Sequence, residues 1–181
     1  MKGAIEKADE IAKKIPNSWI AGQFVNPSNP KAHFESTGPE IWDDTDGNVD
    51  YFVAGVGTGG TLTGVGSYLK SKNEKIKIIA VEPAGSPILS KGISGTHKIQ
   101  GIGANFIPSN YDSSVVDTVI TITDEEAYEE VRWLARNYGI LVGISSGCNV
   151  AAAKKLIDKD YTNVVTVAPD GIEKYLNKYY K

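Results

Sequence analysis

Apolar residues follow two different patterns along the chain. Residues 2–14 carry alanine and isoleucine at helical spacing, so we expect an amphipathic helix that ends before Pro16. Prolines and glycines recur in the next thirty residues, where turns are expected around Pro27 and Pro30. A second helix from Lys31 and a helical turn over residues 38–47 complete this first part of the chain.

From residue 49 onward, short apolar runs alternate with helical patterns. The runs predict strands within residues 49–56, 75–83, 115–122 and 163–171, with helices over 60–72, over 124–139 and from about Ser146. Thr123 or Asp124 is expected to cap the second of these helices. Several runs are apolar throughout, which is typical of parallel strands buried on both faces. The predicted fold class is therefore α/β: a three-layer arrangement of a parallel sheet with helices on both faces.

Composition narrows the function classes. The 181 residues are 41% hydrophobic and 23% charged, as in ordinary globular proteins, and the net charge of −3 favours neither nucleic acid nor an anionic membrane as partner. No apolar run approaches the length of a membrane span, and the charged opening residues do not resemble a signal peptide. A single cysteine, Cys148, excludes an internal disulfide and fits a reducing compartment. We expect a cytoplasmic protein.

A glycine-rich turn follows the strand at residues 49–56. Gly55, Gly57 and Gly60 satisfy the pattern G-x-G-x-x-G, and Glu82 ends the next strand at nearly the spacing of a ribose-binding acid. Taken alone, these residues predict a dinucleotide site. A tight strand–helix turn without any ligand is the simpler alternative.

Two features argue against a dinucleotide. Thr58, Thr61 and Thr63 are interleaved with the glycines, and their hydroxyls suit a terminal phosphate that has several oxygens to satisfy. Glu82 is followed by Pro83, in a turn that more simply closes the strand. The loop therefore predicts a phosphate group at the start of a helix.

Two further clusters bear on the ligand. Ser145 and Ser146 open a helix after a strand, so one of them is expected to cap that helix and the other to face a ligand at the strand ends. Gly101 and Gly103 stand close together, which suggests that a flat group approaches the backbone there.

The motifs together carry a family resemblance. The chain contains, in this order, "GQFVNPSNPKAHFESTGPEIW", "GVGTGGTLTGVG", "VEPAGSPILS", "HKIQGIGANFIP", "GISSG" and "PDGIEKYL". Over nearly its whole length it thus resembles the cysteine synthases (O-acetylserine sulfhydrylases), which are pyridoxal-phosphate enzymes of fold type II. The resemblance implies a β-replacement reaction that makes L-cysteine from O-acetyl-L-serine and sulfide.

The resemblance also implies roles for individual residues. The phosphate of pyridoxal 5'-phosphate is expected on Gly57, Thr58, Gly59, Gly60 and Thr61, and the pyridine nitrogen on Ser145. Gln23 matches a position that helps to bind the substrate carboxylate. Gly101 and Gly103 are expected to present backbone near the reacting amino acid.

One part of the family pattern has no counterpart in the chain. The lysine that forms the aldimine precedes the helix at residues 2–14 in that family, and no lysine here lies in its motif, so no catalytic residue is assigned. We expect residues 1–20 to be a remnant of the small domain and 21–181 an incomplete large cofactor-binding domain. On this interpretation the chain alone is inactive.

The resemblance also implies possible partner proteins. His97 and Lys98 match positions where cysteine synthases receive serine acetyltransferase, although Ile93 replaces a lysine common there, and a homodimer is the other candidate assembly.

Cys148 is interpreted as a small buried residue, with a dipole-lowered pKa as the alternative. Four aspartates, at 43, 44, 46 and 50, are interpreted as a solvated turn, and no metal site is expected.

Three functional hypotheses remain open at this point. In the first, the chain is a piece of a cysteine synthase or one half of a split enzyme. In the second, it is a noncatalytic module that binds the cofactor or serine acetyltransferase. In the third, it is a nicotinamide-dependent protein. Titration with pyridoxal phosphate and with NAD distinguishes the last hypothesis from the other two.

Overall fold

The computed structural model describes residues 2–157 and 162–176 of the chain. Within them lies one parallel sheet in the order β3-β2-β1-β4. The strands are β1 (Tyr51–Gly55), β2 (Lys77–Pro83), β3 (Thr118–Ile122) and β4 (Val164–Thr166). The α-helices are α1 (Lys2–Lys14), α2 (Ser28–Glu35), α3 (Thr37–Asp44), α4 (Gly60–Lys72), α5 (Ile88–Lys91), α6 (Asp124–Tyr138) and α7 (Ile144–Lys154), and a 3-10 turn η1 spans Ile172–Lys174.

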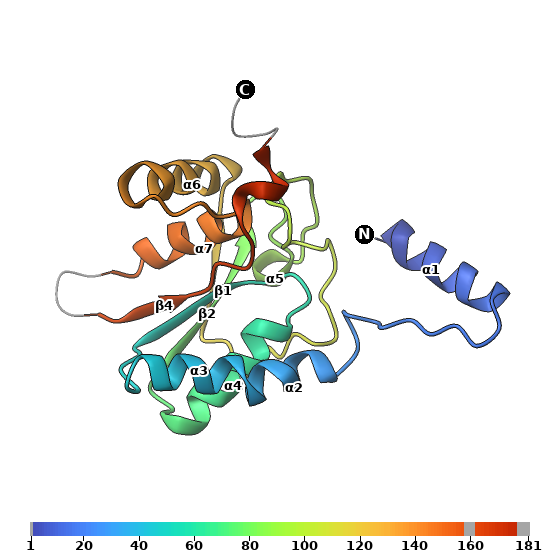
Figure 1. Ribbon diagram of the computed structural model, residues 1–181, viewed down its shortest axis with the longest axis horizontal. Helices are drawn as coiled ribbons and strands as arrows, with labels where there is room; N and C mark the ends of the chain where they lie inside the picture. The colour runs from blue at the N-terminus through green and yellow to red at the C-terminus, as the bar shows by residue number, and fades with distance from the viewer. Residues whose placement is uncertain (1, 158–161, 177–181) are drawn as a thin grey trace.

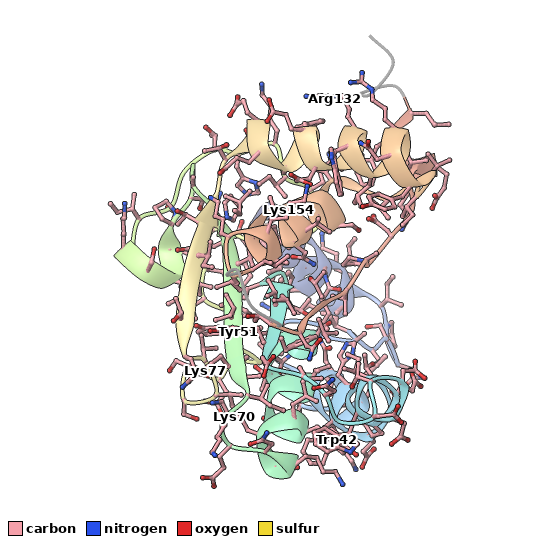
Figure 2. The ribbon with its side chains drawn as sticks, turned by 90° about the vertical axis from the view of Figure 1, so that its left-hand side faces the viewer. Trp42, Tyr51, Lys70, Lys77, Arg132 and Lys154 are labelled. Atoms are coloured by element: carbon pink, nitrogen blue, oxygen red, sulfur yellow. The ribbon has the colours of Figure 1, made fainter. Side chains whose placement is uncertain are left out.

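Helices cover the sheet on both faces (Figure 1). Because side chains alternate along a strand, Val53 and Ile79 belong to the hydrophobic cluster shared with α6 and α7. Phe52 and Ile78 belong to the other cluster, which contains apolar residues of α4. Figure 2 shows Arg132 and Lys154 at the α6–α7 end of the molecule and Trp42 at the α3–α4 end. The predicted three-layer α/β architecture is confirmed.

The sheet brings one set of loops to a common edge. All strand pairs are parallel, and the register aligns Gly55 at the end of β1 with Val81 near the end of β2. The carboxyl ends of parallel strands meet at the same side of the sheet, where open α/β folds bind their ligands. The glycine loop after β1 therefore lies at that side.

Most element boundaries follow the sequence pattern, and the exceptions have local causes. Helix α1 ends at Lys14 as predicted. Helix α2 begins at Ser28, before the predicted Lys31, because Pro30 falls in the first turn, where its missing N–H costs no hydrogen bond. Thr123 caps α6 as expected, in a capping box with Glu126.

Helix α1 and the segment after it extend away from the sheet (Figure 1). Their apolar side chains are poorly covered: Trp19 is 79% exposed and Ile15 is 54% exposed. The assignment of residues 1–20 to a separate small domain stays a prediction. Among the helices in the described ranges, none is both long and apolar enough to cross a bilayer.

Candidate functional site

The glycine loop between β1 and α4 is shaped by two close approaches. A Cβ on Gly57 would collide with the carbonyl oxygen of Gly101, so the two backbones touch only because Gly57 has no side chain. Gly59 has a φ of +85°, and a Cβ there would lie 2.7 Å from the backbone nitrogen of Tyr111. The loop is thereby wedged between two distant segments, and it ends where α4 begins.

Two hydroxyls of the loop contact side chains of α2. Thr58 Oγ1 accepts a hydrogen bond from Asn29 Nδ2 at 2.9 Å, and Thr61 Oγ1 lies 3.1 Å from His33 Nε2. Burial lowers the pKa of His33 below 6.5, which favours the neutral imidazole. The amides at the start of α4, together with these hydroxyls, form a donor set suited to an anion.

The third threonine of the loop has another use. Thr63 Oγ1 accepts a hydrogen bond at 3.0 Å from the backbone nitrogen of Asp112. This bond ties α4 to the loop that contacts Gly59. Thr63 therefore helps to hold the surroundings of the glycine loop in place.

The loop opens into a cleft of about 510 Å³. Five of the residues predicted to bind cofactor or substrate line it, namely Gln23, Gly57, Thr58, Gly101 and Gly103, together with Phe24, His97, Ile102, Ala104 and Asn105. These residues come from three separate stretches of the chain. A volume of this size suits a small ligand of the cofactor class.

Ser145 lies at the rear of the same region. Its side chain is 3% exposed, and a Cβ on Gly101 would lie 3.5 Å from its Oγ. Gly57 therefore contacts Gly101, and Gly101 in turn faces Ser145. Within residues 2–157 and 162–176, the Ser145 hydroxyl has no hydrogen-bond partner, so it is available to a ligand.

The expectation that Ser145 or Ser146 caps its helix is wrong. Helix α7 begins at Ile144 with Gly143 as its N-cap, so both serines lie inside the first turn and neither side chain makes a capping bond. Ser146 Oγ instead donates to the carbonyl oxygen of Asp170 at 3.4 Å. The two adjacent hydroxyls thus have different surroundings.

The acidic residue of the dinucleotide pattern is engaged elsewhere. Glu82 is 1% exposed, and its carboxylate accepts hydrogen bonds from the backbone nitrogens of Leu89 at 2.7 Å and Ser90 at 3.0 Å. It stabilises the start of α5 and is not free to bind a ribose. The G-x-G-x-x-G spacing is therefore not part of a dinucleotide site here.

His97 was proposed for a surface role, and it also lines the cleft. Its Nε2 lies 2.9 Å from the carbonyl oxygen of Gly103, and because a carbonyl only accepts, Nε2 carries the proton. Lys98 is exposed, and its backbone nitrogen donates to Asp124 Oδ1 at 2.9 Å. Sequence reasoning missed the contact of His97 with Gly103, because no local pattern signals it.

Cys148 is not a reactive thiol. The residue is fully buried, and burial raises the pKa of its thiol to about 12. The alternative of a dipole-lowered pKa is wrong, and the interpretation as a small buried residue is confirmed. Of the four aspartates in the predicted turn, Asp50 accepts a hydrogen bond from the backbone nitrogen of Asn163 at 2.8 Å.

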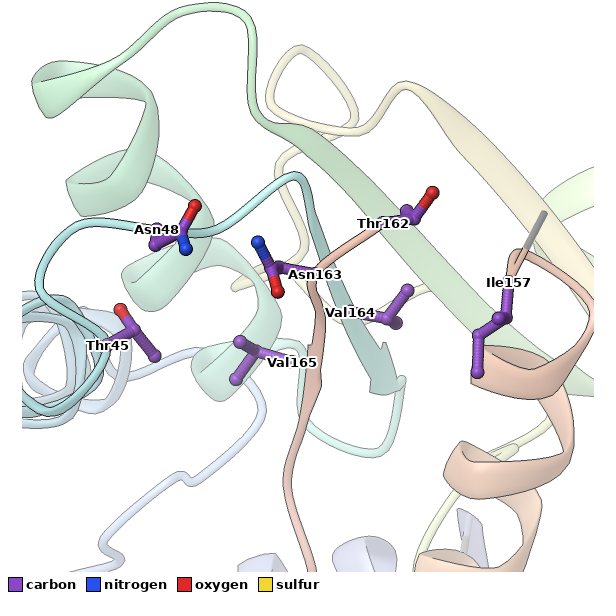
Figure 3. Close-up of a pocket in the computed structure, with 7 residues that line it drawn as sticks. All are labelled: Thr45, Asn48, Ile157, Thr162, Asn163, Val164 and Val165. Atoms are coloured by element: carbon purple, nitrogen blue, oxygen red, sulfur yellow. The ribbon is translucent and has the colours of Figure 1, made fainter. Parts of the chain in front are cut away.

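A second pocket, of about 410 Å³, lies at the opposite end of the sheet (Figure 3). It is lined by Thr45, Asn48, Ile157, Thr162, Asn163, Val164 and Val165, at the amino ends of β1 and β4. None of the predicted site residues lines this pocket, and its lining residues carry no ionisable side chain. The cleft beside the glycine loop is therefore the candidate site.

Known proteins resemble this chain over nearly all of its length. A sequence model of the family described as "Pyridoxal-phosphate dependent enzyme" matches residues 1–170. Cysteine synthase A of Escherichia coli K12 is 52% identical over 98% of this chain and 58% of its own length.

Solved structures give the same result. A hydrogen sulfide-producing enzyme of Fusobacterium nucleatum superposes with a TM-score of 0.92 at 43% identity, over 97% of this chain and 60% of its own. A cysteine synthase of Entamoeba histolytica has a TM-score of 0.91 at 42% identity, over 99% of this chain and 54% of its own. The chain thus spans somewhat more than half the length of the relatives it matches.

The residues of the cleft fit the cofactor that this family implies. Pyridoxal phosphate carries a terminal phosphate, for which the loop offers amides and two hydroxyls at the start of α4. It also carries a ring nitrogen, which can accept a hydrogen bond from the Ser145 hydroxyl, a group without a partner among the described residues. The fold, the donor set and the match over residues 1–170 agree: the chain belongs to the pyridoxal-phosphate-dependent enzyme family, where its relatives include cysteine synthases.

Proposed function

We propose that this chain is the cofactor-binding part of a β-replacement enzyme that makes L-cysteine from O-acetyl-L-serine and sulfide. One observation carries the proposal. The glycine loop, the Gly101–Gly103 turn and Gln23 converge on a single cleft at the carboxyl ends of the strands. The identity to cysteine synthase A of Escherichia coli supports the choice of reaction.

We assign the phosphate to Gly57, Thr58, Gly59, Gly60 and Thr61. Their backbone amides and hydroxyls supply fixed donors at a helix N-terminus, so they bind the phosphate without a lysine or arginine. The pyridine nitrogen is assigned to Ser145. The bound cofactor supplies an electron sink for the substrate amino acid.

Ser145 tunes this chemistry through the kind of hydrogen bond that it makes. A serine hydroxyl donates a hydrogen bond without transferring its proton, because its pKa lies far above neutral pH. Ser145 would therefore hold the ring nitrogen without protonating it, and the cofactor would supply a weaker electron sink than one paired with a carboxylic acid, which suits loss of a good leaving group from the β-carbon.

The substrate is assigned to the other wall of the cleft. Gln23 is exposed and lines the cleft, so its side-chain amide can bind a carboxylate. Gly101 and Gly103 have φ values of +97° and +66° and no side chain, so an amino acid can approach the chain closely there, although the N–H and C=O groups of Gly103 already bond to Val56 and His97.

We propose that the 181 residues bind the cofactor without catalysing the reaction. Among the described residues, those lining the cleft include no lysine to bind the cofactor covalently. The alternative function is a noncatalytic module that binds the cofactor or serine acetyltransferase. His97 lines the cleft and Lys98, next to it in sequence, is exposed, which supports that surface. A homodimer and a cytoplasmic location complete the proposal.

Titration of the purified chain with pyridoxal phosphate tests the proposal. We expect saturable binding that quenches tryptophan fluorescence, is competed by inorganic phosphate and is reversed by dialysis. Gly57→Ala should weaken binding, because the new Cβ meets the Gly101 carbonyl, whereas Gly3→Ala meets nothing within 4 Å and serves as the control. Saturable binding of NAD, or equal binding by the two variants, would contradict the proposal.

A further inference from the structure

We propose that Asn29 is a positioning residue that couples the substrate wall of the cleft to its phosphate loop. The inference rests on the proposed function, because it concerns how the same cleft binds pyridoxal phosphate. Asn29 lies in the first turn of α2, and it does not line the cleft itself. Its side chain nevertheless contacts three residues assigned to the site or directly beside it.

The side-chain amide of Asn29 has two N–H groups, and both are used. One donates to Thr58 Oγ1 at 2.9 Å, and the other to the carbonyl oxygen of Gln23 at 2.9 Å. The amide oxygen lies against Gly60, where a Cβ would collide with it. Asn29 is thus in contact with the start of α4, the phosphate loop and the substrate loop at once.

The bond to Thr58 determines what that hydroxyl can do. Thr58 Oγ1 accepts from Asn29 Nδ2 and, at 3.4 Å, from the backbone nitrogen of Gly60. With both lone pairs engaged, its own hydrogen is left to donate. Asn29 therefore turns Thr58 into a pure donor toward the cleft, which is what a phosphate oxygen requires.

The bond to Gln23 fixes the other wall. The carbonyl oxygen of Gln23 accepts from Asn29 Nδ2 and also from Asn110 Nδ2, each at 2.9 Å. Asn110 holds this loop without touching Thr58, whereas Asn29 holds both. The two asparagines form a matched pair for experiment, because only the side chain of Asn29 bonds to the phosphate loop, whereas Asn110 packs against Gly59 through its backbone alone.

Helix α2 repeats this arrangement one turn later. His33, four residues after Asn29, lies 3.1 Å from Thr61 Oγ1 through its Nε2. Residues four apart lie on the same helix face, so α2 presents both side chains to the glycine loop. Side chains on a helix are positioned more precisely than side chains on a loop, so α2 can hold the hydroxyls of the phosphate loop in a fixed geometry.

The test compares three ligands on Asn29→Ala and Asn110→Ala. For Asn29→Ala we expect pyridoxal phosphate and inorganic phosphate to bind about tenfold more weakly, because Thr58 is no longer oriented to donate to the phosphate and one hydrogen bond to a charged ligand is worth about that much. Pyridoxal, which lacks the phosphate, should bind as it does to the unchanged chain. Asn110→Ala should leave all three affinities within about twofold.

A double-mutant cycle tests whether Asn29 acts through Thr58. Thr58→Val removes the hydroxyl, so adding Asn29→Ala to it should cause little further loss of affinity for pyridoxal phosphate. Combined with Ser145→Ala, the two losses should instead add. Asn29→Ser replaces Asn29→Ala in the cycle if far-ultraviolet circular dichroism finds the alanine variant unfolded.

The outcomes separate this inference from the proposed function. If the unchanged chain binds pyridoxal phosphate and Asn29→Ala binds it equally well, the inference is wrong and the proposed function stands. Equal losses for pyridoxal and pyridoxal phosphate would also overturn it, since Asn29 would then be merely structural. If the unchanged chain binds neither pyridoxal phosphate nor phosphate, both proposals fail together.

Discussion

The side-chain oxygen of Asn149 accepts a hydrogen bond from the backbone nitrogen of Gly55 at 2.8 Å. Its amide nitrogen donates to the carbonyl oxygen of Val167 at 2.9 Å, and the residue is 1% exposed. One buried side chain thereby joins α7 to the last residue of β1 and to the segment after β4. Since α7 also carries Ser145, Asn149 fixes the distance between that hydroxyl and the glycine loop.

Replacing Asn149 should destabilise the protein strongly. Asn149→Ala leaves the Gly55 nitrogen and the Val167 carbonyl without their partner in a buried site, which costs about 2–3 kcal/mol of unfolding free energy. Urea unfolding monitored by circular dichroism measures this loss. The matched control is Asn137→Ala, which removes an exposed bond to the Trp133 carbonyl and should cost less than about 0.5 kcal/mol. Equal losses for the two variants would contradict the structural role of Asn149.

Ser145→Ala should affect the cofactor while leaving the fold intact. The hydroxyl has no partner in the described part of the chain, so its removal is expected to change the unfolding free energy by less than about 0.5 kcal/mol. The affinity for pyridoxal phosphate and the absorbance spectrum of the bound pyridoxal phosphate should both change. Ser146→Ala, which alters the neighbouring hydroxyl, should leave both unchanged. An unaltered spectrum in Ser145→Ala would remove Ser145 from the site.

Cys148 should resist thiol reagents in the folded protein. Burial raises the pKa of its thiol from 9.0 to about 12, so almost no thiolate is present near neutral pH, and the sulfur is inaccessible. A colorimetric disulfide reagent should label the native chain slowly and label it completely in urea. Rapid, stoichiometric labelling of the native chain would mean that α7 opens readily.

His33 should make stability depend on pH. Burial lowers the pKa of the folded state below 6.5, so the folded protein takes up a proton less readily than the unfolded chain. The stability due to the neutral imidazole is therefore present above pH 6.5 and is lost as the pH falls below it. We expect the urea midpoint to drop between about pH 7.5 and about pH 5, and His33→Gln to reduce that drop.

Asp117 does not obscure this measurement. Asp117, whose pKa is lowered from 3.8 to about 2 by the backbone nitrogen of Ile78 and by Lys70 and Lys77, loses its contribution only below pH 3.8. A drop of the same size in His33→Gln would assign the pH dependence to another group.

The sequence by itself determined the features that depend on neighbouring residues. Alternation of strands and helices specified the parallel sheet, because apolar runs bounded by turns can be buried only between helices. The sequence limited the cap of α6 to Thr123 or Asp124, and the structure shows Thr123 in a capping box with Glu126. Glycines and threonines after β1 predict a phosphate loop, since this chemistry needs only local backbone amides and hydroxyls.

The tertiary structure decided which distant residues meet. Glu82 lies at the spacing of a ribose ligand, yet its carboxylate binds the start of α5. Ser145 and Ser146 are adjacent in sequence, yet only packing against Gly101 and Asp170 distinguishes them. Asn29 reaches Thr58 because the first turn of α2 packs against Gly60 at the start of α4. Such contacts follow from the packing of whole elements, and no pattern of neighbouring residues encodes them.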